Sequence, residues 1–157
     1  MNLEQMKQHY TEFDVWVKSL RDITDTEWQM PLGEGKWSVA AVVAHLLFWD
    51  KYSLEERFPY FKEGAVLPSY PDFQGVNDRA REYAEKTATK DQVLDELLVI
   101  RKEYRKMLDQ MDSDKLAVSF NISDNHMTVG AYLIDFIQHD LHHQKQVGTA
   151  LGRTLVK

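Results

Sequence analysis

Apolar residues recur at helical spacing in four long stretches of the chain, with polar residues at the positions between them. In the first stretch, residues 3–21, the apolar positions are Leu3, Met6, Tyr10, Phe13, Val17 and Leu20. Residues 38–57, 89–108 and 128–151 show the same kind of pattern, which is typical of helices with one buried face. The pattern therefore predicts four long amphipathic helices.

Residues that favour helix ends stand at the boundaries of these stretches. Ser38, Thr89 and Thr128 each precede an apolar run, where a side-chain oxygen can accept a hydrogen bond from a free backbone N–H. Gln92 follows Thr89 by three residues and completes a capping box. Gly152 directly follows the fourth stretch, where a glycine commonly ends a helix. These residues predict where the last three helices begin and where the last one ends.

The connections between the predicted helices differ in character. Residues 58–75 hold three of the four prolines among several aromatic residues, which favours a long aromatic loop over a regular helix. Residues 76–86 are expected to form a short polar helix. Residues 112–127 alternate only weakly in hydrophobicity, so we expect a loop with extended character that is too short to build a sheet.

Four helices without a second strand pattern predict an all-α four-helix bundle, formed by residues 1–157 as a single domain. The connection between the second and third helices is long enough to travel the length of the bundle. These two helices are therefore expected to run parallel, in an up-down-down-up order.

Composition narrows the chemistry that this bundle can carry. The chain has 19 basic and 25 acidic residues, a net charge of -6 and no basic run, so we expect no nucleic-acid partner. No apolar run reaches the roughly 18 residues of a membrane span, and the first residues do not resemble a signal peptide. We therefore expect a cytoplasmic protein without a membrane partner. Because cysteine is absent, any metal ligand must be an imidazole, a carboxylate, a carbonyl or water.

Three of the six histidines lie in the segment DFIQHDLHHQKQV, residues 135–147, within the fourth predicted helix. At about 100° per residue, His143 falls within the apolar arc of this helix and His139 lies just beside it. By the same count His142 is expected to face solvent. His139 and His143 are four residues apart, which places both side chains on one face at a spacing suited to one ion. The spacing selects these two of the three as candidate metal ligands.

A further histidine, His45, lies in the middle of the apolar stripe of residues 38–57. A buried imidazole needs hydrogen-bond partners, because an unpaired polar group costs about 1–3 kcal/mol, and a tyrosine or a carboxylate can satisfy a single one. Three inward-facing histidines would repel one another if protonated, and a shared cation reconciles them most simply. We therefore predict a divalent-metal site of His45, His139 and His143 with open positions for water or substrate.

The letters HDLHH also allow other interpretations. They read His-acid-x-x-His, similar to the motif of zinc proteases, but residues 144–157 offer no histidine or acid as a third ligand. A ferritin-like two-metal site needs more acid and histidine pairs than the chain provides. Asp140 projects toward the core by the same angular count. It is therefore either a hydrogen-bonded helix carboxylate or a catalytic group that orients a ligand or acts as a base.

Two segments resemble the signature regions of a known family. They are WSVAAVVAHLLFWD, residues 37–50, and MTVGAYLIDFIQHDLHHQKQV, residues 127–147. Their order and spacing are similar to those of the DinB-like (YfiT-like) metal-binding four-helix bundles, and the resemblance spans nearly the whole chain. It places the metal-binding histidines of that family on His45, His139 and His143.

The family resemblance implies further properties. The ion would be a divalent metal, with zinc first and nickel as the alternative, the helix order would be up-down-down-up, and homodimers are frequent. Relatives include thiol transferases that use a low-molecular-weight thiol such as bacillithiol, and a mycothiol-dependent isomerase. Where the family commonly has Arg-Gly-Gln after the second histidine of the pair, this chain has Gln144, Lys145 and Gln146. This difference removes an arginine that could bind an anionic substrate.

The leading functional hypothesis is a metal-dependent enzyme that acts on a small molecule, as a thiol S-transferase or a hydrolase. A divalent ion on three imidazoles can activate water or a thiol near neutral pH. Arg101, an inward-facing charge on the third helix, is a candidate catalytic residue that holds an anionic substrate group, and loop 58–75 is a candidate cover. The simpler alternatives are an arginine that reaches solvent and a loop that only packs on the bundle. The rival function is a non-catalytic, metal-stabilised binding bundle.

Overall fold

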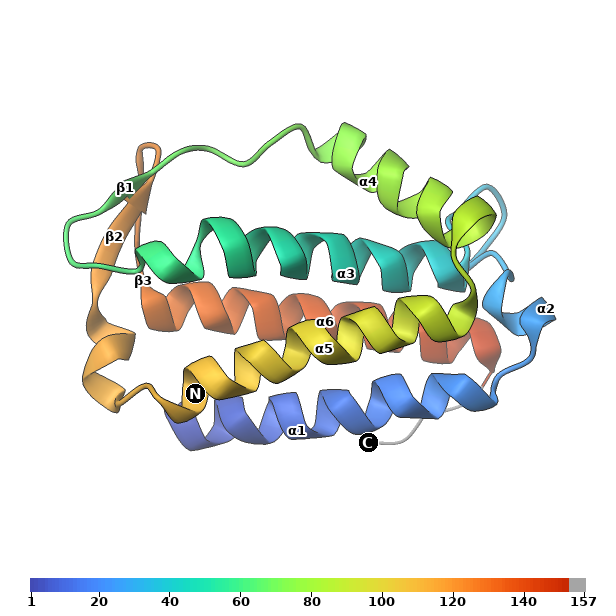
Figure 1. Cartoon of the computed structure of the whole chain (residues 1–157), viewed down its shortest axis with the longest axis horizontal. Helices are drawn as coiled ribbons and strands as arrows, with labels where there is room; N and C mark the ends of the chain where they lie inside the picture. Colours follow the sequence, from blue (N-terminus) through green and yellow to red (C-terminus); the bar gives the residue numbers. More distant parts are fainter. Residues whose placement is uncertain (153–157) are drawn as a thin grey trace.

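The computed structural model describes residues 1–152, and residues 153–157 of the predicted domain lie outside the described part. Figure 1 shows four long helices side by side, with α1 and α6 running in one direction and α3 and α5 in the other. This arrangement confirms the predicted four-helix bundle and is consistent with the up-down-down-up order. None of the described helices is long and apolar enough to cross a membrane. The long helices are α1 (Leu3–Ser19), α3 (Val39–Glu56), α5 (Lys90–Asp109) and α6 (Val129–Leu151).

The helix boundaries follow local signals in the sequence. The side chains of Ser38, Thr89 and Thr128 each accept a hydrogen bond from a backbone N–H in the following turn, as predicted. Gly152 ends α6 in the left-handed conformation, with φ of 67°. Asn2 forms a capping box for α1 that the hydrophobic pattern did not predict. Short helical turns fill several connections: η1 (Leu20–Asp22), α2 (Asp25–Trp28), η2 (Phe58–Tyr60) and η4 (Ser113–Ala117).

A small sheet forms at one end of the bundle, and the prediction that residues 112–127 build no sheet is wrong. Its strands are β1 (Val66–Leu67), β2 (Ser119–Ile122) and β3 (Asn125–Thr128). The strands β2 and β3 form an antiparallel hairpin, and β1 pairs with β2 in parallel, with Val66 opposite Asn121. The weak alternation within residues 112–127 could not reveal this sheet, because the strand β1 comes from the distant connection between α3 and α4.

The long connection after α3 is also more regular than predicted. The helix α4 (Phe73–Glu82) begins within the expected aromatic loop, because the Asp72 side chain accepts a hydrogen bond from the backbone of Gly75 at 3.1 Å. A π-helical turn, η3 (Tyr83–Thr87), follows it. Figure 1 shows α4 lying along α3 on the outside of the bundle. Side chains of α4 are therefore available to residues of α3.

The buried apolar side chains form two clusters, one toward each end of the bundle. Between them lies a layer of buried polar side chains, one from each long helix: His9, Asp50, Arg101 and Asp140. Each of these side chains is at most 8% exposed. We call these four residues the polar layer, and it crosses the bundle next to the histidines of α6.

Candidate metal centre

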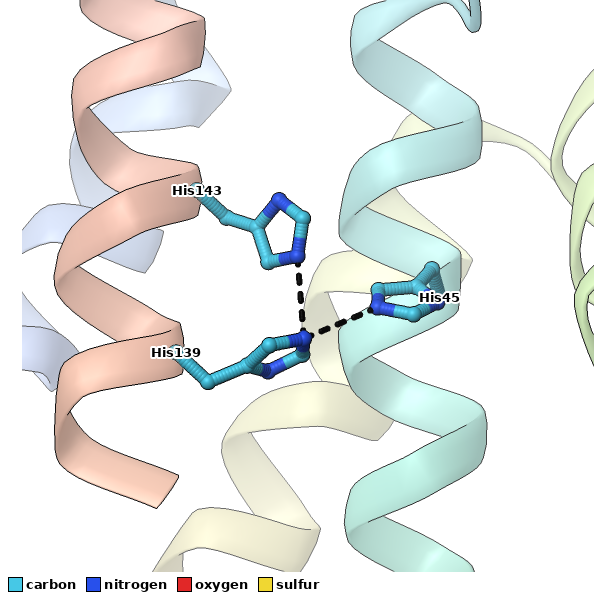
Figure 2. Close-up of side chains that lie close together, drawn as sticks. All are labelled: His45, His139 and His143. Atoms are coloured by element: carbon cyan, nitrogen blue, oxygen red, sulfur yellow. Dashed lines mark hydrogen bonds between the residues drawn. The ribbon is translucent and has the colours of Figure 1, made fainter. Parts of the chain in front are cut away.

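Three histidines converge between α3 and α6, as Figure 2 shows. His45 lies about two turns into α3, and His139 and His143 occupy successive turns of α6. The Nε2 atom of His139 is 3.2 Å from that of His45 and 3.0 Å from that of His143. One ring nitrogen from each histidine lies within 4.8 Å of the other two. The structure thus brings together the three residues that the sequence selected.

The distances between these nitrogens suit a common ion. Two nitrogens on a tetrahedral ion with bonds of about 2.0–2.1 Å stand about 3.3–3.4 Å apart, close to the two short contacts in the triad. A shared hydrogen atom satisfies the three nitrogens less well than a metal ion does. A single N–H of His139 cannot point along both of its contacts at once, whereas one cation accepts a lone pair from each ring.

The outer nitrogen of His45 is fixed by α4. Its Nδ1 lies 2.8 Å from Oδ1 of Asn77, and the indole Nε1 of Trp49 donates to the same oxygen at 2.9 Å. An indole N–H can only donate, so the Asn77 atom must be an acceptor and Nδ1 of His45 must carry its proton. The Nε2 atom of His45 is therefore an unprotonated lone pair directed at the other two histidines. This is the tautomer that a metal ligand requires.

The other two histidines are held less extensively. The Nδ1 atom of His143 lies 2.7 Å from Oε1 of Gln146, one turn further along α6. This contact lets the amide oxygen of Gln146 accept a hydrogen bond from Nδ1–H, as the outer partners of metal-binding histidines commonly do. His139 is the most exposed of the three. Solvent therefore reaches the three histidines from the side of His139.

Burial favours the neutral form of each imidazole. Loss of solvation lowers the pKa of His45 to about 4 and that of His143 to about 4, despite the hydrogen bonds that their rings donate to amide oxygens. Burial also lowers the pKa of His139. Only the neutral imidazole can bind a metal. The three rings are thus in the ligand form at neutral pH without help from an ion.

The donor set decides which ions fit. Three imidazole nitrogens suit zinc, nickel, copper or iron, and they suit magnesium or calcium poorly, because those ions prefer oxygen ligands. Three protein ligands with room beside them are typical of catalytic zinc sites, whereas structural zinc sites usually have four. The residues present therefore fit a divalent transition metal with at least one exchangeable position.

A cavity of about 410 Å³ opens beside the triad. His45 and His139 line it, together with Asp135, which stands one turn before His139 on α6. Its volume lies in the range of sites for small molecules, about 300–1,000 Å³. The remaining walls are mostly aromatic: Trp49, Tyr70, Phe73, Met127, Tyr132 and Phe136. The cavity suits a small ligand with an apolar body.

Asp140, a candidate catalytic residue from the sequence, points away from this cavity. Its Oδ2 atom accepts hydrogen bonds from Nε2 of His9 at 2.8 Å and from Arg101 at 2.7 Å, and Oδ1 accepts a second from Arg101 at 2.7 Å. Burial raises the pKa of this carboxyl, but the charge and hydrogen bonds of Arg101, together with the hydrogen bond from His9, outweigh burial and hold the pKa below its ordinary value. Asp140 is therefore an ionised member of the polar layer, in contact with α1 and α5.

Arg101, the second such candidate, is also absent from the cavity wall. Its side chain is fully buried, and it donates to Asp50 as well as to Asp140. The ring of Phe13 lies 3.8 Å from its guanidinium carbon. The expected role in holding an anionic substrate group does not fit this placement, because two carboxylates of the protein already occupy the guanidinium. The simpler alternative, an arginine that reaches solvent, does not fit either, because the side chain is fully buried.

The sequence did not point to two residues that the structure places at the site. Asp135 stands four residues before His139, so the same spacing argument that paired the histidines could have found it. Asn77 had no such signal, because it reaches His45 from a separate helix that packs on α3. A local pattern cannot show a contact of this kind.

Comparison with known proteins adds to this picture. A family model described as the DinB superfamily matches residues 5–147. Among solved structures, the fold is similar to that of YfiT from Bacillus subtilis, described as a probable metal-dependent hydrolase with an unusual four-helix bundle topology. The TM-score is 0.75 at 18% sequence identity, covering 96% of this chain and 88% of that one. A search of curated proteins found no match.

The family match and the site concern the same part of the molecule. The matched residues 5–147 reach into all four long helices and include all three histidines of the triad. The chain therefore belongs to the DinB superfamily.

Proposed function

We propose that this protein is a divalent-metal-dependent enzyme that activates a nucleophile beside the three histidines and directs it at a small substrate in the adjoining cavity. The observation that carries the proposal is the convergence of three ring nitrogens, one with its tautomer fixed by Asn77 and Trp49, at the wall of a cavity of about 410 Å³. Zinc is the ion that we expect first, and nickel is the alternative.

We propose separate roles for the groups around the cavity. A bound divalent ion would lower the pKa of an adjacent water or thiol and so supply a nucleophile near neutral pH. Trp49, Tyr132 and their aromatic neighbours would hold the apolar part of the substrate and exclude water from the reacting groups. The chain has no cysteine, so a thiol nucleophile would have to come from a second small molecule.

We assign the role of proton acceptor to Asp135 and not to Asp140. Asp135 is exposed and lines the cavity on the same face of α6 as His139. Asp140 is buried and has both carboxylate oxygens engaged by His9 and Arg101. We propose that Asp140 and Arg101 are positioning residues, which fix the rotation of α6 and thereby the direction of His139 and His143.

Two reactions are compatible with this site. Hydrolysis is favoured by the likeness to a protein described as a probable metal-dependent hydrolase. Transfer of a low-molecular-weight thiol to an electrophile is the second candidate, and the apolar aromatic walls favour it, because they suit an apolar electrophile. Two assays separate these reactions. Hydrolysis of a nitrophenyl ester detects the first, and loss of thiol in the presence of chlorodinitrobenzene detects the second.

Metal content tests the proposal first. The protein is purified without added metal, and divalent ions are measured by elemental analysis in the native chain, in His45→Ala and in His142→Ala. We expect near-stoichiometric metal in the native chain and in His142→Ala, and little in His45→Ala. Equal and negligible metal in all three would refute the metal site.

Catalysis is tested separately with and without chelator. We expect turnover in one of the two assays that chelator abolishes and added metal restores, with a large loss in Asp135→Asn but not in the exposed control Asp124→Asn. Stoichiometric metal without chelator-sensitive turnover in either assay would favour the rival function, a non-catalytic bundle stabilised by metal.

We propose two further properties. Assembly as a homodimer rests on the family resemblance, and a location in the cytoplasm rests on the composition of the chain. Light scattering at micromolar concentration tests the first, and cell fractionation tests the second.

A further inference from the structure

A second arginine lies buried near the cavity, at the end of α3. Arg57 follows the last residue of α3, and its side chain is 0% exposed. Its Nη1 donates to the backbone oxygen of Pro68 at 2.7 Å. Its guanidinium carbon lies 4.6 Å from the ring centre of Tyr70 and 5.2 Å from that of Tyr52. The charge is therefore enclosed by two aromatic rings and one carbonyl group.

One edge of this guanidinium has no partner. The Nε and Nη2 atoms of Arg57 are buried, and neither is hydrogen-bonded within residues 1–152. These two N–H groups point in parallel and match the two oxygens of a carboxylate. Leaving a charged donor unpaired in the interior is costly, so such groups call for an explanation. In Arg57 two adjacent donors, Nε and Nη2, are buried and unpaired within the described chain.

The comparison with Arg101 shows what such an edge binds in this protein. In Arg101 the Nε and Nη2 atoms donate to the two carboxylate oxygens of Asp50, at 2.7 and 3.2 Å. Both arginines are fully buried and both lie against aromatic rings. The edge that Asp50 occupies in Arg101 is the edge that is empty in Arg57. The unpaired edge of Arg57 therefore has the chemistry of a carboxylate-binding group.

Tyr70 connects this edge to the cavity. Its ring lines the cavity and also covers the guanidinium of Arg57. Tyr70 belongs to the connection between η2 and α4, residues 61–72, in which the two-residue strand β1 is the only helix or strand. Displacement of this ring would break no hydrogen bond of Arg57, because Pro68 holds Nη1 through its backbone. Arg57 would thus keep its anchor if the ring moved aside.

We propose that Arg57 is an anion subsite of the cavity, and that it binds a carboxylate carried by the substrate once the Tyr70 ring moves aside. This inference rests on the proposed function in that the cavity receives the substrate. Arg57 stands twelve residues after His45, just beyond the end of α3, so about 18 Å of helix separates the backbone positions of the two residues. The substrate class is therefore an extended molecule with an apolar body and a carboxylate remote from the reacting group.

The test uses the full chain freed of metal with a chelator, because a carboxylate could otherwise bind the ion. Phenylbutanoate and its neutral amide are titrated against the protein. Calorimetry reports binding, together with tryptophan fluorescence, to which Trp49 in the cavity wall contributes. We expect the native chain to prefer the carboxylate by about tenfold or more. Arg57→Met should remove this preference, and Arg81→Met, which removes an exposed arginine of α4, should retain it.

Two further arms make the outcome decisive. Arg57→Lys keeps the charge without the paired donors, so it should weaken carboxylate binding several-fold; it also serves as the test if Arg57→Met does not fold, as judged by circular dichroism. Inorganic phosphate and formate are titrated alone. If they bind as tightly as phenylbutanoate, the group is a general anion site, and the substrate assignment is wrong.

The result separates this inference from the proposed function. Equal binding of the acid and the amide, or a preference that survives in Arg57→Met, would overturn the subsite. A preference that appears only after metal is restored would also overturn it, while supporting the metal centre. A preference in metal-free protein that depends on Arg57 supports the subsite even if the metal centre fails its own test.

Discussion

Two polar clusters lie side by side on α6, and they satisfy their buried groups in opposite ways. His139 belongs to the triad, and the next residue, Asp140, belongs to the polar layer. Consecutive positions on a helix point about 100° apart, so one turn of α6 supplies both clusters. The polar layer contains its own cation, the guanidinium of Arg101, between Asp50 and Asp140. The triad contains three facing nitrogens and no cation of the protein.

This difference indicates which cluster supports the fold and which supports the function. Charges that compensate one another within the protein need nothing from outside, and removal of one member leaves the others unpaired. Converging neutral nitrogens are complete only when a proton or a metal ion joins them. We therefore expect stability to depend mainly on the polar layer, and response to added metal to depend on the triad.

The largest effect is expected from breaking the polar layer. Arg101→Ala leaves Asp50 and Asp140 buried without their cation, and such losses cost about 3–5 kcal/mol. The free energy of unfolding, measured in denaturant on the metal-free chain, should fall by about this amount. Lys102→Ala, at an exposed neighbouring position of α5, should change it by less than about 0.5 kcal/mol. A similarly small change in Arg101→Ala would show that the polar layer does not support the fold.

Added metal should act on the other cluster. At a hundredfold excess over its dissociation constant, zinc should stabilise the native chain by about 2.7 kcal/mol, seen as a rise in melting temperature. His45→Ala should lose this rise, and His142→Ala, which alters the exposed neighbour of His143, should keep it. An equal rise in both variants would place the metal elsewhere.

A smaller effect is expected from the partner of His45. Asn77→Ala removes the oxygen that fixes the Nδ1 proton of His45, and the loss of such partners typically weakens metal affinity by about 10–100-fold. Competition with a metal-binding dye measures the affinity. Replacement of the exposed Asp78 next to it, in Asp78→Ala, serves as control. Unchanged affinity in Asn77→Ala would mean that packing of α3 alone orients the ring.

The pH dependence of the metal-free chain tests the burial of the same histidines. Burial lowers the pKa of His45 and of His143 to about 4 in the folded state, against about 6.5 in the unfolded chain. At these two histidines the unfolded chain therefore binds more protons between these values, so their contribution to the free energy of unfolding should decrease as pH falls from about 6.5 toward 4. Denaturant unfolding across this range measures it. In His45→Ala the pH dependence should be shallower, and an identical dependence would contradict the assignment to the triad.

The parts of the fold that depend on neighbours in sequence were predictable. Ser38, Thr89 and Thr128 cap their helices as the sequence indicated, because a cap is a contact across three residues. The sheet was not predictable in the same way, since β1 and β2 lie far apart in the chain and each is too short for a clear alternation. The early start of α4 depends on the cap formed by Asp72, which is hard to recognise in a segment with three prolines.

For the candidate site, the periodicity of two helices was enough to select three histidines. The angular position of His45, His139 and His143 follows from helix geometry, and the bundle architecture then brings their two helices together. The same geometry placed Asp140 and Arg101 on inward faces but could not say which neighbours they meet. Both side chains turn to each other and away from the cavity, because Asp50 and His9 lie on that side.

The sequence by itself determined the helices, their caps and the set of inward-facing histidines, because these depend on spacing along a helix of fixed pitch. Only the tertiary structure decided that Asn77 holds His45, that Asp135 and not Asp140 faces the cavity, and that Arg57 keeps an unpaired edge behind Tyr70. The physical reason is that a hydrogen bond between distant segments depends on how whole elements pack. Packing is a property of the assembled bundle, and no local pattern of residues contains it.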